Sequence, residues 1–130
     1  MIYWQNRILT NVKKTLGSKC ASVVATTLNT KAKFPAMMVK VVSNASTADD
    51  LEYDEENAVR CVVTLEAFSK TSLQEAVNLI GDANTAMYRM GFKRRQGPVE
   101  LENVEAPEVF RVSARYLRTI GSSDTIELFT

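Results

Sequence analysis

Charged side chains gather by sign at separate places in this sequence. Six carboxylates fall within eight positions, at Asp49, Asp50, Glu52, Asp54, Glu55 and Glu56. Grouped carboxylates can bind a cation, or transfer protons where burial raises one pKa. This run lacks the spacing and the turn glycine of a calcium-binding loop, and so polar a stretch is typical of solvated loops. We therefore expect these acids to face solvent or a partner protein and to bind no metal.

The basic residues gather elsewhere, in one group at Lys93, Arg94 and Arg95 and a second at Arg111, Arg115 and Arg118. An acidic segment on one copy of the chain would complement a basic face on the next copy. Such head-to-tail contacts close into a ring when the rotation allows. Two other interpretations stay open: these bases are solvated, or they contact nucleic acid. Nucleic-acid binding is disfavoured because no aromatic residues interleave with the arginines.

Residues for catalysis are scarce. The 130 residues include no histidine and two cysteines, which excludes histidine-activated nucleophiles, histidine-containing zinc sites and four-cysteine metal sites. Glycine-rich phosphate-binding motifs and the nucleophile-elbow motif are absent as well. The formal net charge of +1 argues against duplex nucleic acid as the main partner. We expect no catalytic residue, no metal and no cofactor.

Nothing in the sequence indicates secretion or membrane insertion. The first residues lack the basic and apolar pattern of a signal peptide, and no apolar run reaches the length of a membrane span. Cys20 and Cys61 fall in strand-like segments, and we expect reduced, packed thiols in a cytoplasmic product. Tyr3 and Trp4 open the first helix, where they either cap the core or anchor a partner.

Apolar periodicity predicts two helices, over residues 2–16 and 72–90. The second begins with a capping box at Ser72 and Glu75 and ends at Gly91. β-branched or alternating segments predict strands over 20–28, 36–42, 58–68, 92–96, 99–104 and 108–120. The remaining features are a long acidic loop over 43–57, an exposed hairpin arm over 92–104 and a tail over 121–130. Its last residues, 126–130, are suited to add an edge strand to their own sheet or to a neighbour's.

The order of these elements predicts an α+β fold. Two helices cannot cover both faces of a sheet of about five strands. We therefore expect one domain over residues 1–130, a mostly antiparallel sheet, and both helices packed on one face. Alternation over 58–68 assigns one face to Val59, Cys61, Val63, Leu65 and Ala67. The other face is mixed, with Arg60, Thr64 and Glu66 beside the apolar Val62 and Phe68. Gly81, inside the second helix, suggests a close approach of that helix to the sheet.

Several short motifs occur in an order that one protein family shares. Phe34-Pro35 precedes a strand, Phe68-Ser69 ends one, and Glu75-Ala76 lies near the start of the second helix. That helix ends in Met90-Gly91-Phe92, and the last strand contains Phe110-Arg111 and Arg115-Tyr116. Taken in this order, over residues 2–120, the chain resembles the tail-terminator (tail-completion) proteins of long-tailed bacteriophages.

The resemblance implies a structural role in the virion, without catalytic residues. Such proteins are small α+β subunits that form a hexameric ring on the last ring of the tail tube, stop its polymerisation and offer a surface to the head-side connector. The implied partners are further copies of the chain, the tail tube protein, the head–tail connector or stopper protein and, in a contractile tail, the sheath protein. DNA passes through the lumen only as cargo, and no membrane is involved. The chain is then made in the host bacterial cytoplasm and resides in the tail neck.

On this interpretation, the mixed sheet face and the hairpin over 92–104 meet neighbouring subunits or the tube. The loop over 43–57 orders on assembly, and Arg111 and Arg115 lie at a subunit contact or at the ring lumen. The rival interpretations are another neck or tail subunit (a connector adaptor, a head-closure protein or the tube protein), a small enzyme that works through carboxylates or arginine, and a small ligand-binding α+β module. The sequence offers the enzyme no cluster of ionisable groups.

Overall fold

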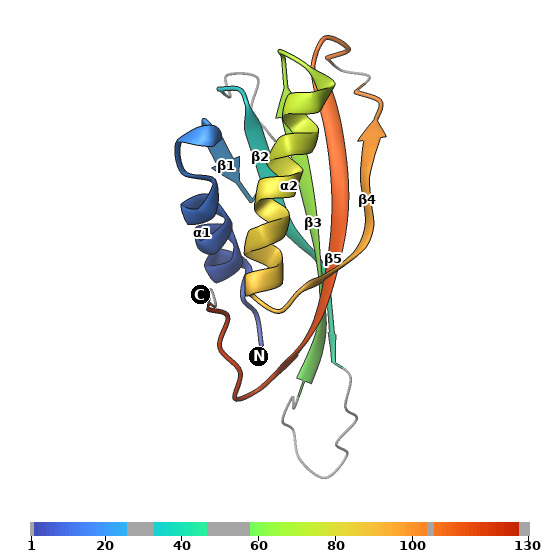
Figure 1. Cartoon of the computed structure of the whole chain (residues 1–130). Helices are drawn as coiled ribbons and strands as arrows, with labels where there is room; N and C mark the ends of the chain where they lie inside the picture. The colour runs from blue at the N-terminus through green and yellow to red at the C-terminus, as the bar shows by residue number, and fades with distance from the viewer. Residues whose placement is uncertain (1, 26–32, 47–57, 104–105, 128–130) are drawn as a thin grey trace.

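The computed structural model describes residues 2–25, 33–46, 58–103 and 106–127. It contains two α-helices, α1 (Gln5–Leu16) and α2 (Leu73–Arg89), and a short 3-10 helix, η1 (Gly17–Lys19). Five strands form one sheet: β1 (Ser22–Val24), β2 (Ala36–Ser46), β3 (Ala58–Ser69), β4 (Lys93–Leu101) and β5 (Phe110–Gly121). Their order is β1-β2-β3-β5-β4, with β1 parallel to β2 and every other pair antiparallel. The predicted α+β fold is confirmed (Figure 1).

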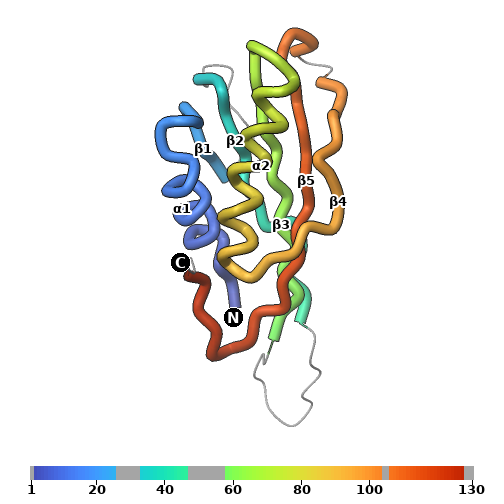
Figure 2. The backbone as a smooth tube through the Cα atoms, viewed as in Figure 1, coloured from blue at the N-terminus to red at the C-terminus, as the bar shows by residue number. Residues whose placement is uncertain are grey.

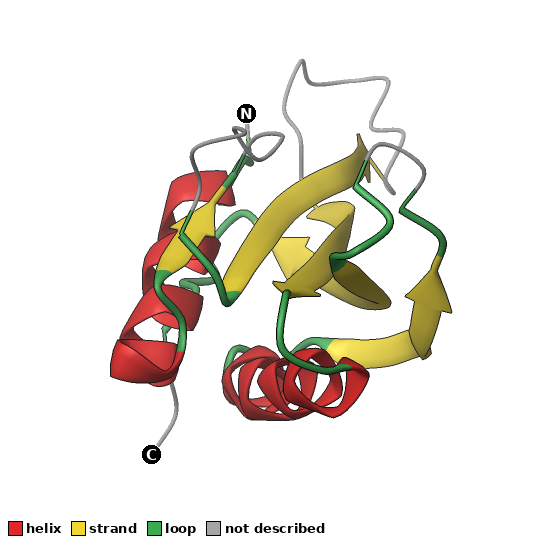
Figure 3. Cartoon of the chain, turned by 90° about the horizontal axis from the view of Figure 1, so that it is seen from above, coloured by secondary structure: helices red, strands yellow, loops and turns green. Residues whose placement is uncertain are grey.

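Both helices lie on the same side of the curved sheet, as the view from above shows (Figure 3). Their apolar stripes and one side of the central strands form a single core. On β3 the residues predicted for the covered face are all fully buried: Val59, Cys61, Val63, Leu65 and Ala67. Tyr116 on β5 is also fully buried, and its hydroxyl donates a hydrogen bond to Asn84 Oδ1 on α2 at 2.7 Å. Residues of the opposite parity on these strands therefore turn to the other face.

Helix α2 begins at an N-terminal cap. The sequence pattern predicts that Ser72 and Glu75 form this cap, and in the structure Ser69 takes part as well. Ser72 Oγ accepts a hydrogen bond from the backbone N–H of Glu75 at 3.1 Å, as in a capping box. The Glu75 carboxylate, however, accepts from the hydroxyl of Ser69 at 2.7 Å. Ser69 Oγ in turn accepts from the backbone N–H groups of Thr71 and Ser72. The buried Ser69 thus joins the end of β3 to the start of α2.

Two glycines of this helix region have different roles. Gly91, with φ of +83°, follows α2 in the left-handed conformation predicted for its end. Gly81 is exposed in the middle of α2, and a Cβ atom built there meets no atom within 4 Å outside the helix backbone. The expected close approach of Gly81 to the sheet is therefore wrong.

The first helix begins later than predicted, because α1 starts at Gln5 and not at residue 2. The buried side chain of Gln5 bonds to the edge of β2: Nε2 donates to the Val39 carbonyl at 2.9 Å, and Oε1 accepts from the Val41 N–H at 2.7 Å. The short strand β1 pairs with β2 only as far as Met38. The amide of Gln5 therefore continues the hydrogen bonding along that edge.

Two predicted boundaries of the sheet are wrong. β2 continues to Ser46, so residues 43–46 belong to a strand and not to the acidic loop predicted over 43–57. They pair with β3 beyond an irregularity between Val41 and Ser43. Residues 47–57 of that loop lie outside the described residues. β1 covers only Ser22–Val24 of the strand predicted over 20–28, and residues 26–28 also lie outside the described part.

Strand β4 replaces the hairpin arm predicted over 92–104. It is a single strand at the edge of the sheet, and its pairing with β5 shifts register on both sides of Gln96. Gly97 lies in the second shift, with φ of +89°, and a Cβ atom there would come within 2.3 Å of the Ser113 carbonyl oxygen. Only glycine fits such a close approach of two backbones. Gly97 and Pro98 therefore form a bulge within one strand and not a break between two.

After β5 the chain returns to the helices (Figure 2). Ile126 is fully buried in the core, and its carbonyl oxygen accepts a hydrogen bond from the buried Asn11 Nδ2 at 3.0 Å. Glu127 forms an ion pair with Arg7 on α1. Beyond Gly121, where β5 ends, the described tail residues up to Glu127 contain no strand. Of the residues suggested for an edge strand, 126–130, only Ile126 and Glu127 are described, and neither lies in a strand.

Both cysteines are free and buried, as predicted for packed thiols. Burial raises the pKa of the Cys20 thiol and raises that of Cys61 to about 11. Both thiols therefore stay protonated at neutral pH. No helix within the described residues combines the length and the apolar character needed to cross a membrane.

Candidate interface on the open face of the sheet

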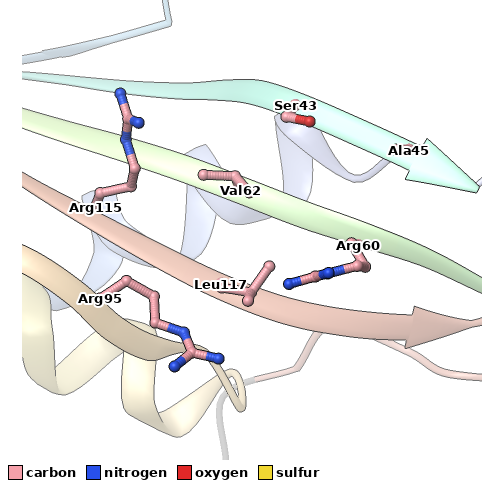
Figure 4. A pocket seen from close by; sticks show the side chains of 7 residues that line it. All are labelled: Ser43, Ala45, Arg60, Val62, Arg95, Arg115 and Leu117. Atoms are coloured by element: carbon pink, nitrogen blue, oxygen red, sulfur yellow. The ribbon is translucent and has the colours of Figure 1, made fainter. Parts of the chain in front are cut away.

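The face of the sheet that points away from the helices, called the open face below, carries a basic hollow. Its volume is about 330 Å³. Seven residues from β2, β3, β4 and β5 line it: Ser43, Ala45, Arg60, Val62, Arg95, Arg115 and Leu117 (Figure 4). Three of these seven are arginines and none is acidic, so the lining is strongly cationic.

Strand register explains why these side chains meet. Val62 on β3 pairs with Leu117 on β5, and the two form an apolar floor. Arg60 lies two residues before Val62, and Arg115 lies two residues before Leu117, so all four share one face. Arg95 reaches in from β4, where the pairing with β5 shifts register. Figure 4 shows the three arginine side chains placed around the apolar pair.

The three arginines of the hollow are exposed and have no hydrogen-bond or ion-pair partner among the described residues. Each guanidinium group offers five N–H donors and matches a carboxylate or phosphate in geometry. Positive charges gathered at one hollow also repel each other. An anionic group placed there would reduce the repulsion and accept the donated hydrogen bonds. The hollow is therefore suited to bind an anion.

Arg111 lies on the same face but has a partner within the chain. Its Nη2 donates to Glu66 Oε1 at 2.7 Å, and its Nε donates to Glu66 Oε2 at 3.3 Å. The Glu66 side chain is only 10% exposed. Arg111 therefore neutralises a nearly buried carboxylate. Of the two arginines predicted for a subunit contact, Arg115 alone lacks a partner in the part of the chain that is described.

Arg118 lies on the opposite face of β5, with its side chain 15% exposed. Its Nη1 donates a hydrogen bond to the carbonyl oxygen of Met90 at the end of α2. Its Nη2 lies 3.6 Å from the Asp124 carboxylate. A cation is favourable there because the C-terminal end of a helix carries partial negative charge. The structure thus assigns Arg118 contacts inside the chain and places it away from the hollow.

The other residues predicted for contacts also lie apart from the hollow. Lys93 and Arg94, at the start of β4, are exposed but do not line it. Tyr3 is 58% exposed, whereas Trp4 is partly buried against the core. The six predicted acids lie within 47–57, outside the described residues: Asp49, Asp50, Glu52, Asp54, Glu55 and Glu56.

Thr64 lies at the centre of the open face, paired with Lys40 on β2 and Arg115 on β5. Its hydroxyl is buried and has no hydrogen-bond partner among the residues that the structure describes. Buried polar groups in folded proteins are usually hydrogen-bonded. The middle of the open face thus contains one buried polar group without a partner in the described part of the chain.

The residues that line the hollow are suited to binding. Among the described residues, the lining contains no carboxylate, thiol or imidazole that could transfer a proton or attack a substrate. Guanidinium groups stay protonated in proteins. Among the described residues, no three histidine, cysteine, aspartate or glutamate side chains gather where they could hold a metal ion. Electrostatic and hydrogen-bonding contacts to an anionic partner are what this arrangement supports.

Sequence patterns did not single out Arg60, Val62 and Leu117 as site residues. Alternation did place Arg60 on the open face, and the same two-residue period places Leu117 with Arg115. What the alternation lacks is the pairing of β3 with β5, which brings Val62 against Leu117. Alternation on each strand indicates which side chains lie on the open face. It does not give the register between the strands, which brings these side chains together.

The chain matches no protein-family model, and no curated protein is significantly similar to it.

Proposed function

We propose that this chain is a structural subunit of a bacteriophage tail neck, a tail terminator whose copies form a ring on the end of the tail tube. The ring stops polymerisation of the tube and offers a surface to the head-side connector, and it has no catalytic role. The observation that carries the proposal is the open face, where three exposed arginines surround an apolar floor. Complementary charges on such a surface would set the orientation and the choice of partner.

The distribution of charge supports self-assembly. The formal net charge is only +1, yet six acids fall within residues 49–56. On the open face, in contrast, the described residues that line the hollow include three arginines and no acid. Copies whose charged patches all had the same sign would repel each other. Copies that carry both a positive and a negative patch can associate head to tail. The α+β fold, with both helices on one face, is also the fold that the family resemblance implies.

On this proposal the partners are further copies of the chain, the tail tube protein and the head–tail connector or stopper protein. A contractile tail would add the sheath protein. DNA would pass through the lumen as cargo, and the chain would reside in the neck of the virion.

Electron microscopy of phage particles assembled without this chain tests the role. A terminator predicts overlong tails or tails that are not joined to heads. Particles without any tube would instead identify the tube protein, and normal particles would contradict a role in the tail. The neighbouring genes give a second test, because connector and tube genes should flank the gene for this chain.

A small ligand-binding module is the second candidate, because the hollow has the size of a site for a small molecule. Such a module would bind a small polyanion saturably and would remain monomeric at high protein concentration. Calorimetric titration with inorganic phosphate and with citrate distinguishes the two. For a terminator we expect only weak heats that disappear at moderate salt.

A further inference from the structure

The two edges of the sheet differ in what covers them. At one edge, β1 is only three residues long, and the buried side chain of Gln5 bonds to the neighbouring β2 backbone at Val39 and Val41. At the other edge, β4 extends over nine residues (Figure 1). Among the described residues, β5 alone forms hydrogen bonds with the β4 backbone. The backbone N–H and C=O groups on the outer side of β4 can therefore pair with a further strand.

Two opposite charges of β4 lie on the same side of the sheet. Arg94 pairs with the buried Tyr116 of β5, and Glu100 pairs with the buried Val112. Residues directly opposite each other in a sheet share a face, so Arg94 and Glu100 both lie on the helix side. Both are exposed, and neither has a hydrogen-bond or ion-pair partner in the described ranges.

The spacing of these two charges fits a second copy of the same strand. In an antiparallel pair of identical strands, residues equally far from the centre lie opposite each other. With Gly97 at the centre, Arg94 of each copy lies opposite Glu100 of the other, so the contact occurs twice. Lys93 then opposes Leu101, and both lie on the open face, since they pair with open-face residues of β5. A shift by one residue would bring side chains of different faces together.

We propose that β4 pairs antiparallel with β4 of a second copy of the chain, in the register centred on Gly97. The two sheets then form one continuous sheet, with the helices of both copies on the same side. Arg94 and Glu100 form two ion pairs between the copies. The inference goes beyond the proposed ring and does not rest on it. A ring uses two different surfaces of each copy, whereas this contact uses one strand twice.

The same strand discourages pairing with unrelated strands. Lysine, proline and bulges on an edge usually prevent indiscriminate pairing. Pro98 has no N–H to donate and Gly97 lies at a bulge, so the hydrogen bonds come from the halves on either side of them. Three consecutive cations, at 93–95, also repel a strand that brings no acid in register. A copy of β4 brings Glu100 in register, which favours a second copy as the partner.

Sedimentation velocity of the full chain over a range of concentrations tests the contact. We expect a reversible equilibrium between monomer and dimer. Arg94→Glu places carboxylates opposite each other at both ends of the contact, and Glu100→Arg places guanidinium groups there. Each substitution alone should weaken dimerisation about tenfold or more, because like charges directly opposite each other destabilise a strand pair.

Two combinations restore opposite charges. The double variant Arg94→Glu/Glu100→Arg should dimerise within about threefold of the unchanged chain. A mixture of the two single variants should form heterodimers, because each brings the charge that the other lacks. The proposal is overturned if the double variant stays as weak as the single ones, if the mixture forms no heterodimer, or if the unchanged chain is monomeric at every concentration. Thermal unfolding of each variant verifies that it is folded.

The control variant Lys13→Glu/Lys14→Glu changes the net charge more than either single substitution, at two exposed positions of α1. Its dimerisation should stay within about threefold of that of the unchanged chain, because charges farther apart than the Debye length are screened. A loss as large as that of Arg94→Glu would contradict the assigned contact.

Hydrogen exchange locates the contact along the chain. The backbone amides of residues 93–101 should exchange more slowly as the protein concentration rises, because the second copy covers their edge. A dimer that leaves this exchange unchanged would use another surface, which overturns the proposal. A ring through other surfaces would add larger species to every variant alike, and it is tested separately by particles that lack the chain. The two proposals can therefore fail independently.

Discussion

The arginines of β5 show that the role of one residue depends on the face of the sheet where its side chain lies and on whether a carboxylate is close to it. Arg111 and Arg115 share the open face, and Arg118 lies on the other one. Arg111 is held by Glu66 through two hydrogen bonds, at 2.7 and 3.3 Å. Arg115, four residues along, has no partner among the described residues and lines the hollow. A charge reversal that probes assembly therefore belongs at Arg115 and not at Arg111.

We expect Arg111→Gln to lower the free energy of unfolding by about 2 kcal/mol, because it leaves the nearly buried Glu66 carboxylate without its partner. The matched change Arg115→Gln should alter it by less than about 0.5 kcal/mol. Denaturant unfolding followed by circular dichroism measures both. The double variant Glu66→Gln/Arg111→Gln should recover most of the loss. Similar losses for Arg111→Gln and Arg115→Gln would refute the assigned pairing.

At the scale of elements, the sequence predicts correctly those features that depend on a local periodicity or a local motif alone. The alternation over 58–68 identified the buried side of β3, and the pattern at Ser72 located the start of α2. Polar composition misled at residues 43–46, which continue β2 because their backbone pairs with β3. The pair Gly97-Pro98 was interpreted as a break, although β5 holds both halves of β4 in one strand.

Gly97 and Gly81 form a matched pair for testing this description of β4. Gly97→Ala should lower the free energy of unfolding by about 3 kcal/mol, because the new Cβ atom would meet the Ser113 carbonyl and φ is positive. Gly81→Ala, in the middle of α2 with open space around it, should raise it by up to about 1 kcal/mol. Thermal or denaturant unfolding gives both values. Equal effects of the two substitutions would disprove the bulge geometry.

At the scale of the whole molecule, the two faces of the sheet have opposite properties. One is closed by α1, α2 and the tail with the buried Ile126, and the other carries the basic hollow. The fold class followed from counting helices against strands. The hollow could not be predicted in that way, because Arg60, Arg95 and Arg115 come together only through the register of three strands.

The closed face also determines how stability depends on pH. Burial raises the pKa of Cys61 to about 11 and that of Tyr116 to about 12, from ordinary values of 9.0 and 10.0. Between the ordinary and the raised pKa of each group, the folded chain keeps a proton on that group that the unfolded chain has released. The free energy of unfolding should therefore be unaffected by these groups below about pH 9 and fall as pH rises to about 12.

Denaturant unfolding at a series of pH values measures this decline. In Tyr116→Phe the phenol no longer titrates, so the decline between about pH 10 and 12 should become shallower. Loss of the hydrogen bond to Asn84 should lower stability by about 1 kcal/mol at neutral pH. An unchanged slope would mean that the Tyr116 hydroxyl is not protected by burial.

Electron microscopy of particles assembled with the Arg95→Glu/Arg115→Glu chain tests the central claim most directly. The claim is that the basic hollow of the open face is the contact by which a tail terminator assembles. It predicts the same overlong or unjoined tails as in particles without the chain, and normal tails with the Lys13→Glu/Lys14→Glu chain. Normal tails with the Arg95→Glu/Arg115→Glu chain would contradict it.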